Sequence, residues 1–342
     1  MKKLFTLIIV CGVIFSCKKK EEETAPEETP TTTGTTTPDK IYPDTVWNET
    51  GTGPKLIFKF KFDSTQARLD AFGNPLTTLP SGHGAYSPKF NQMAAHYIEL
   101  APTDFDSLGK GKVLYHAPET TSGGATAIKF SHSTVVREGV TFFSIPLSQI
   151  TAGTYKWLRL SLSYQNYDIP YKDVNLPGNH IGTGTIASFL GYRTYVTKYK
   201  IKDKDYTPSS QPSVGGPYVN HPQGYWGFES YIPGYPTNNG YWMSDGQAPA
   251  GATTVVNPNF ANSPIPAGSC VVTAVFTDVN GNPLNLTIPS SATTDIIVTV
   301  SLSTNKSFEW IEVGTPDGYF QPGIGEAAVD MGIRGMIPKV QY

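Results

Sequence analysis

The sequence predicts an all-β fold, an antiparallel β-sandwich, and three observations support this prediction. Segments with alternating or continuous hydrophobic residues follow one another from Trp47 to the C-terminus, separated by turn-forming residues. Charged residues account for only 16% of the 342 residues, whereas 33 glycines, 28 prolines, 19 tyrosines and 17 phenylalanines favour turns and strands. No segment of comparable length keeps the 3.6-residue period of an amphipathic helix. We therefore expect one β-sandwich domain over residues 47–342.

The clearest strand has the sequence LIFKFKF, at residues 56–62. Its three phenylalanines alternate with two lysines, which is typical of a strand with one buried face. Further strands are expected at residues 93–100, 112–116, 125–131, 140–147, 154–164, 182–201, 270–278, 284–288 and 295–303.

A short motif, GNPL, occurs twice, within residues 69–80 and within residues 276–289. In the second copy Asp278, Asn280 and Asn282 alternate as calcium ligands do, but the distal carboxylate of an EF-hand loop is missing. The pair Asn-Gly in this copy is the one that a type I′ turn favours, and alternating segments flank it. We expect a hairpin here and not a calcium site.

Residues 203–266 interrupt the succession of predicted strands with a segment rich in Tyr, Gly, Pro and Asn. This composition predicts a long loop insertion, and loops of this length are usually functional or packed onto the domain. The aromatic residues of interest in it are Tyr225, Trp226, Tyr235, Tyr241 and Trp242. They form either a platform that stacks on glycans or a cover for the edge of the sandwich. We favour the cover, because exposed aromatic patches of that size are uncommon.

The N-terminus has the features of a targeting segment. Two lysines precede an apolar run over residues 4–15, which is too short for a transmembrane helix. The run ends in Ile14-Phe15-Ser16-Cys17, which resembles the lipobox of bacterial lipoproteins, where the cysteine is acylated. We expect residues 1–17 to be a lipoprotein signal peptide ending at Cys17, whose lipid holds the protein at a membrane. An ordinary secretory signal is the alternative.

Residues 18–46 are expected to form a disordered tether between the lipid and the domain. Residues 18–40 contain no aromatic or β-branched aliphatic side chain, so they cannot bury enough surface to offset their chain entropy. The charged block directly after Cys17 resembles the export tag that sends lipoproteins of Bacteroidetes-type bacteria to the cell surface. This resemblance implies an outer-membrane lipoprotein exposed at the cell surface, with the periplasmic face as the alternative.

Composition and motifs exclude several classes of function. The formal net charge is −2 and no cluster of Lys and Arg with interleaved aromatics occurs in the body, so we expect no nucleic-acid partner. The H-E-x-x-H, G-x-S-x-G, C-x-x-C and phosphate-loop motifs are missing, so we expect a binding protein and not an enzyme. Cys270 would be the only cysteine left after processing and acylation, which excludes an internal disulfide.

Three stretches resemble the MbnP-like protein family. Tyr97-Ile98-Glu99-Leu100 stands where the family has a tyrosine-rich strand, and Ala152-Gly153-Thr154-Tyr155 matches its "aGtY" step. Residues 56–62 and the GNPL motif behind them resemble the family's opening strand and turn. The resemblance implies a secreted β-sandwich that, in the best-known members, binds copper through histidines and a Trp-x-His element. This sequence has no Trp-x-His element.

The candidate metal ligands are His83, His96, His116 and His132. No two of them have the spacing that puts two imidazoles on one strand or helix face, so they would have to converge from different strands. The alternative is that each is a buried, hydrogen-bonded core residue. For His96 the alternation with Ala94 and Ile98 favours that alternative.

Three functions are consistent with the sequence. The first is metal handling, with copper as the cofactor that the family resemblance implies. The second is glycan binding through the aromatic insertion, and the third is a structural or partner-docking role. The sequence does not identify a ligand or a protein partner.

Overall fold

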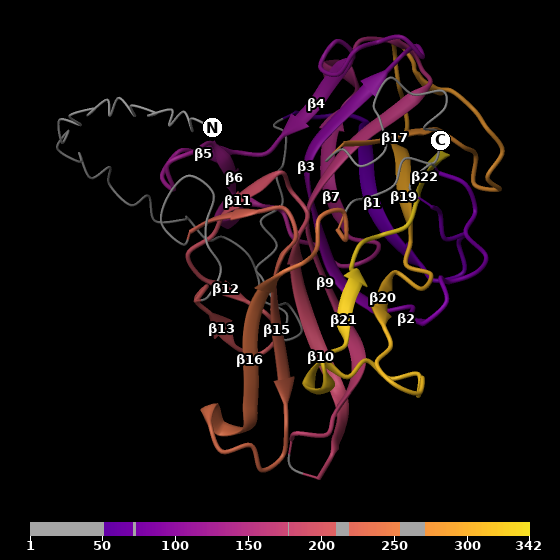
Figure 1. Ribbon diagram of the computed structural model, residues 1–342. Helices are drawn as coiled ribbons and strands as arrows, with labels where there is room; N and C mark the ends of the chain where they lie inside the picture. Colours follow the sequence, from indigo (N-terminus) through magenta and orange to yellow (C-terminus); the bar gives the residue numbers. More distant parts are fainter. Residues whose placement is uncertain (1–50, 71–72, 177, 210–218, 254–270) are drawn as a thin grey trace, which may run out of the picture. The chain divides into compact units, whose positions relative to one another are not determined.

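The computed structural model describes residues 51–342 except 71–72, 177, 210–218 and 254–270 (Figure 1). All the described residues belong to one compact unit of the chain, residues 36–342. The predicted signal peptide with Cys17, the tether and Cys270 lie outside the described residues. In the described part of the chain, no helix has the length and hydrophobicity needed to cross a membrane.

The all-β prediction is confirmed, and nearly all regular structure is strand. The largest sheet has seven antiparallel strands in the order β16-β15-β10-β9-β3-β4, and β17 also pairs with β9. These strands are β3 (Lys89–Ala101), β4 (Lys112–His116), β9 (Trp157–Asp173), β10 (His180–Phe189), β15 (Tyr225–Tyr231), β16 (Tyr241–Gln247) and β17 (Val271–Val275).

A second sheet has four strands in the order β22-β19-β1-β7. These strands are β1 (Lys55–Asp63), β7 (Thr141–Pro146), β19 (Ile296–Ser303) and β22 (Met336–Gln341). The sheet is mixed, because β1 and β19 run parallel while the other two pairs are antiparallel. A parallel pair needs a long crossover connection, and here most of the chain lies between its two strands.

Smaller sheets and short 3-10 helices complete the described structure. Two further sheets have the orders β2-β20-β21 and β14-β11-β6-β5, and β12-β13 and β18-β8 are isolated pairs. These strands are β2 (His83–Tyr86), β5 (Glu119–Thr120), β6 (Ala127–Lys129), β8 (Gly153–Tyr155), β11 (Arg193–Tyr195), β12 (Tyr199–Lys200), β13 (Asp205–Tyr206), β14 (Asn220–Pro222), β18 (Leu286–Ile288), β20 (Phe308–Ile311) and β21 (Ala327–Asp330). The 3-10 helices are η1 (Phe130–His132), η2 (Leu147–Gln149), η3 (Asn238–Gly240) and η5 (Pro322–Ile324).

The main hydrophobic core joins the two larger sheets. The phenylalanines of β1 alternate with its lysines as expected, and Phe58 and Phe60 are fully buried. They belong to the same hydrophobic cluster as Leu158 and Leu160 of β9. Phe60 also stacks on Phe142 of β7, with 3.9 Å between ring centroids. Two sheets that share one core in this way form a sandwich.

Part of the predicted loop insertion, residues 203–266, is β-structure. β15 and β16 form a hairpin that extends the largest sheet, with Tyr231 opposite Tyr241 near its turn (Figure 1). The prediction was wrong for this hairpin, because glycines weaken a strand pattern while cross-strand aromatic contacts stabilise the pairing. Residues 210–218 and 254–266 of the insertion lie outside the described residues.

The second GNPL motif forms a compact loop closed by Asp278. The Asp278 N–H donates to the Asn282 carbonyl at 2.8 Å, and its carboxylate accepts from the backbone N–H groups of Asn280 and Asn282. Gly281 has a φ of +92°, but Asn280 does not adopt a positive φ, so the turn is not type I′ as predicted. The Asp278 carboxylate thus closes its own loop.

Candidate functional site

Two of the predicted histidines lie together, and a glutamate joins them. His96, His116 and Glu119 each place one potential ligand atom within 4.8 Å of the other two. His96 Nε2 is 3.1 Å from Glu119 Oε1, and His116 Nε2 is 3.6 Å from the same oxygen. The two imidazole rings meet edge to face, with 4.7 Å between their centroids. We call these three residues the His–Glu cluster.

The pairing of β3 with β4 brings the two histidines together. His116 is the last residue of β4 and lies opposite Tyr97, so it is next to His96. The Ala117 N–H donates to the His96 carbonyl at 2.7 Å, which holds the chain where it leaves β4. The chain then passes into β5, whose first residue is Glu119.

A β-bulge directs His96 into the cluster. Ala95 pairs with Leu162 of β9, and Tyr97 pairs with the adjacent residue, Ser161. His96 lies between them and is the extra residue of the bulge. Strand alternation is therefore interrupted at His96. The His96 side chain is buried as expected, with only 7% of it exposed. Its polar partner is the carboxylate of Glu119.

The electrostatic environment keeps His96 neutral over most of the physiological range. Burial, and to a smaller extent the neighbouring His116, lower the pKa of His96 from 6.5 to about 4, although the carboxylate of Glu119 acts in the opposite direction. A neutral imidazole has a free lone pair, which is the form that binds a metal ion.

Glu119 is oriented by a third group. The Tyr192 hydroxyl donates to Glu119 Oε1 at 2.7 Å, and its ring lies 5.8 Å from that of His96. Hydrogen bonds of this kind fix the direction of a metal-binding carboxylate. The side chains of His116 and Glu119 are 50% and 26% exposed, so the cluster is open to solvent on one side.

Two imidazoles and a carboxylate are a donor set for transition metals. Imidazole nitrogen suits copper, zinc, iron and nickel, and a set of two histidines and one glutamate leaves a coordination position for water or another ligand. Nitrogen and oxygen donors favour a divalent ion over copper(I), which prefers sulfur. The donor chemistry of the His–Glu cluster therefore fits the copper that the family resemblance implies.

The other two predicted ligands lie elsewhere. His83 is on β2, where its Nδ1 contacts the carboxylate of Glu309 on β20. Arg68 also contacts Glu309, so His83 takes part in a network of ion pairs. His132 ends η1, and neither histidine belongs to the His–Glu cluster. The structure therefore does not bring His83 and His132 together with the other two predicted ligands.

Glu119 is the residue of the cluster that the sequence analysis missed. Its signal was present, since His116 and Glu119 are three residues apart in the sequence HAPE. The alternation of residues along a single strand could not predict their contact, because His116 ends β4 and Glu119 begins β5.

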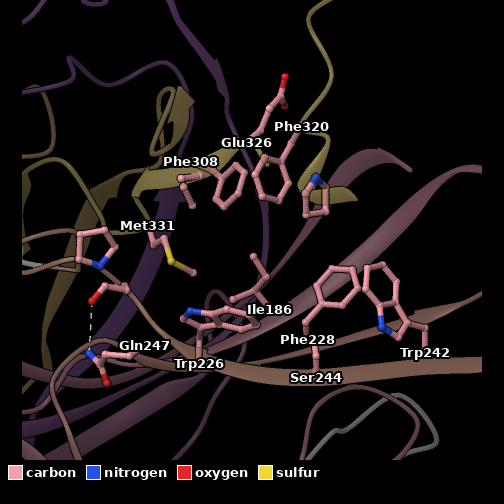
Figure 2. A pocket seen from close by; sticks show the side chains of 15 residues that line it. Ile186, Trp226, Phe228, Trp242, Ser244, Gln247, Phe308, Phe320, Glu326 and Met331 are labelled. Carbon is pink, nitrogen blue, oxygen red and sulfur yellow. Dashed lines mark hydrogen bonds between the residues drawn. The ribbon is translucent and has the colours of Figure 1, made fainter. Parts of the chain in front are cut away.

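The five aromatic residues proposed as a glycan platform do not share one surface. Trp226 and Trp242 both line a cavity that faces β20 and β21 (Figure 2). Tyr225 is fully buried on the opposite face, where its hydroxyl donates to Asp245 at 2.9 Å. Tyr241 packs on Tyr231, and the Lys204 ammonium lies 4.3 Å from the centroid of its ring. Tyr235 lies in the segment between β15 and β16.

Comparisons of this chain with protein-family models, curated proteins and solved structures gave no match. The resemblance to MbnP-like proteins therefore stays a prediction from short motifs.

Proposed function

We propose that this protein is a lipid-anchored extracytoplasmic binding protein that holds a divalent transition-metal ion, copper(II) in the first place. The ligands are the Nε2 atoms of His96 and His116 and the carboxylate of Glu119. The observation that carries the proposal is the convergence of these three groups from β3, β4 and β5 within 4.8 Å. The lipobox-like sequence ending at Cys17 supports the anchored, extracytoplasmic location.

The arrangement around Glu119 Oε1 favours a metal site over a simple hydrogen-bond network. Two imidazole nitrogens and the Tyr192 hydroxyl all approach this one oxygen. A network that served only to satisfy a buried histidine would need a single partner for His96. The second histidine is half exposed and needs no partner of its own, yet it is directed at the same point.

The metal preference follows from the donors. Among first-row divalent ions, copper(II) binds nitrogen and oxygen ligands most tightly, and zinc binds them more weakly. His96 is a neutral imidazole near neutral pH, so a metal ion does not have to displace the second proton of an imidazolium there. With three protein ligands, the bound ion keeps a position for an exchangeable ligand, which suits storage or delivery of the metal.

The test is a metal-binding measurement on the full-length protein in detergent. After treatment with a chelator, the protein is titrated with copper(II) and with zinc(II), and bound metal is counted by elemental analysis after gel filtration. We expect one equivalent of copper that is lost in His116→Ala and at least about ten-fold weaker in Glu119→Gln. His132→Gln is the matched control and should bind as the wild type does.

Two results would contradict the proposal. The first is the absence of saturable copper binding by the wild-type protein. The second is binding that His116→Ala leaves unchanged, because copper would then be held elsewhere on the chain. Tighter binding of zinc than of copper would keep the site but overturn the choice of metal.

Glycan binding through the aromatic residues stays a second prediction, and the structure weakens its argument. A sugar needs a wide aromatic face bordered by hydrogen-bonding groups, whereas Trp226 and Trp242 turn toward an apolar cavity. The partner-docking role stays a third prediction, and no particular surface of the described residues favours it.

A further inference from the structure

A cavity of about 350 Å³ lies between the β15–β16 hairpin and the region of β20 and β21 (Figure 2). Trp226, Phe228 and Trp242 form the side contributed by the hairpin. Phe308 and Phe320 form part of the opposite side. The cavity is partly open to solvent, so a small molecule can reach it, and its volume lies within the range of small-molecule sites.

Two glycines of the sheet make room for the rings on the hairpin side. A Cβ atom at Gly246, opposite Trp226 on the neighbouring strand, would lie 2.4 Å from the Trp226 ring. A Cβ atom at Gly184 of β10 would lie 2.1 Å from the Phe228 ring. Both rings therefore lie against the sheet and do not fill the space above it. Gly246 of the hairpin and Gly184 of β10 thus help to keep the cavity open.

The opposite side is held by the backbone. The Phe320 carbonyl accepts from the Lys172 N–H at 2.9 Å, which ties this segment to the end of β9. The Phe308 and Phe320 rings meet edge to face, with 5.1 Å between centroids. Met331, which also lines the cavity, is fixed by its N–H, which donates to the Ala252 carbonyl at 2.7 Å. Both sides of the cavity are thus formed without a ligand.

The lining is apolar and carries no charge directed inward. Glu326 is the charged residue of the lining, and its carboxylate accepts from the backbone N–H groups of Gln321, at 2.6 Å, and Val313. Figure 2 shows this carboxylate directed away from the aromatic side chains. Gln247 donates to the Gln223 carbonyl at 2.7 Å.

These features define the chemistry of an occupant. Aromatic walls favour a flat ring system that stacks on one ring and meets the edges of others. The absence of an inward charge disfavours ions, and the scarcity of polar groups disfavours sugars. The volume is at the small end of the range of about 300–1,000 Å³ for small-molecule sites, which disfavours long chains.

We propose that this cavity is a binding site for a small, neutral, aromatic molecule. Trp226, Phe228 and Trp242 contact one side of the molecule, and Phe308 and Phe320 contact the other. The site is separate from the His–Glu cluster, since the two share no residue.

The test compares two fluorescent dyes of similar shape and different charge on the full-length protein. Phenylnaphthylamine is neutral, and anilinonaphthalene sulfonate is an anion. We expect saturable binding of the neutral dye, with quenching of tryptophan fluorescence, and at least about ten-fold weaker binding of the anion. Palmitate and a soluble β-glucan are added as competitors and should not displace the neutral dye.

Two substitutions link the signal to the cavity. Ala328→Leu adds a larger side chain to the lining, and Trp242→Leu removes one wall; each should weaken dye binding at least about ten-fold. Tyr241→Leu changes the adjacent residue outside the lining and is the matched control. Thermal unfolding of each variant shows whether it is folded, and Ala328→Leu should still bind copper.

Three results would overturn the proposal. One is a wild-type protein that binds the neutral dye without saturation. Another is dye binding that both Ala328→Leu and Trp242→Leu leave unchanged. The third is displacement of the dye by palmitate or by the glucan, which would assign the cavity to an acyl chain or a sugar. None of these results depends on whether the His–Glu cluster binds a metal.

Discussion

Acidification should destabilise the metal-free protein through His96. Burial lowers the pKa of His96 from 6.5 in an unfolded chain to about 4 in the folded protein. The folded state therefore binds fewer protons than the unfolded state between these two values, so its stability falls as the pH falls. The contribution is fully present above pH 6.5 and is lost as the pH approaches 4.

The size of the effect follows from the same values. The gap between 6.5 and about 4 corresponds to about 3 kcal/mol, at about 1.4 kcal/mol for each pKa unit. Between pH 7 and pH 5, His96 alone should lower the free energy of unfolding by about 2 kcal/mol. The His96 side chain is only 7% exposed, so solvent screening does not remove this contribution.

Urea unfolding of the chelator-treated protein at pH 7 and pH 5 measures the change. Other groups also titrate in this range, so the decisive quantity is the difference between wild type and His96→Gln. Glutamine can still donate to Glu119 but does not titrate, so the variant should lose about 2 kcal/mol less between the two pH values. His132→Gln should behave as the wild type does. Equal losses in wild type and His96→Gln would refute the reasoning.

Three other changes test separate parts of the structure. Tyr192→Phe removes the hydrogen bond that orients Glu119 and should weaken copper binding about 10- to 100-fold in a titration, with thermal stability nearly unchanged. Glu99→Gln leaves the buried guanidinium of Arg159 without its charged partner and should lower the free energy of unfolding by about 3–5 kcal/mol in urea; a loss below 1 kcal/mol would show that the pair is not important. Cys17→Ala should abolish incorporation of radiolabelled palmitate and release the protein from membranes, and continued labelling would place the lipid elsewhere.

The strands were largely predictable because most of them carry their pattern locally. β1 alternates phenylalanine with lysine, and one face of it is buried as expected. The β15–β16 hairpin was not predictable in the same way, because glycines on it and on the neighbouring β10 have a role only in relation to side chains of adjacent strands. Gly246 accommodates the Trp226 ring and Gly184 accommodates the Phe228 ring, and neither contact can be inferred from a single strand.

The candidate site was predictable in its residue types and only partly in its members. His96 and His116 meet because β3 pairs with β4 in one register, and a shift of that register would separate them. The bulge at His96 depends on the neighbouring β9, so strand alternation in the sequence gives no sign of it. His83 and His132 have the same side chain but lie on β2 and η1, which are not part of the β3–β4 pair.

The parallel pairing of β1 with β19 has a consequence for how the chain folds. β1 lies between β7 and β19, and Leu56 pairs with Ile296. One edge of β1 therefore has no partner until nearly the whole chain has been made and, if the protein is exported, translocated. Contacts between residues so distant in sequence form slowly, because a long loop must close first. A chain truncated before residue 296 would leave the hydrogen-bonding groups of β1 open to a second molecule, and it should aggregate.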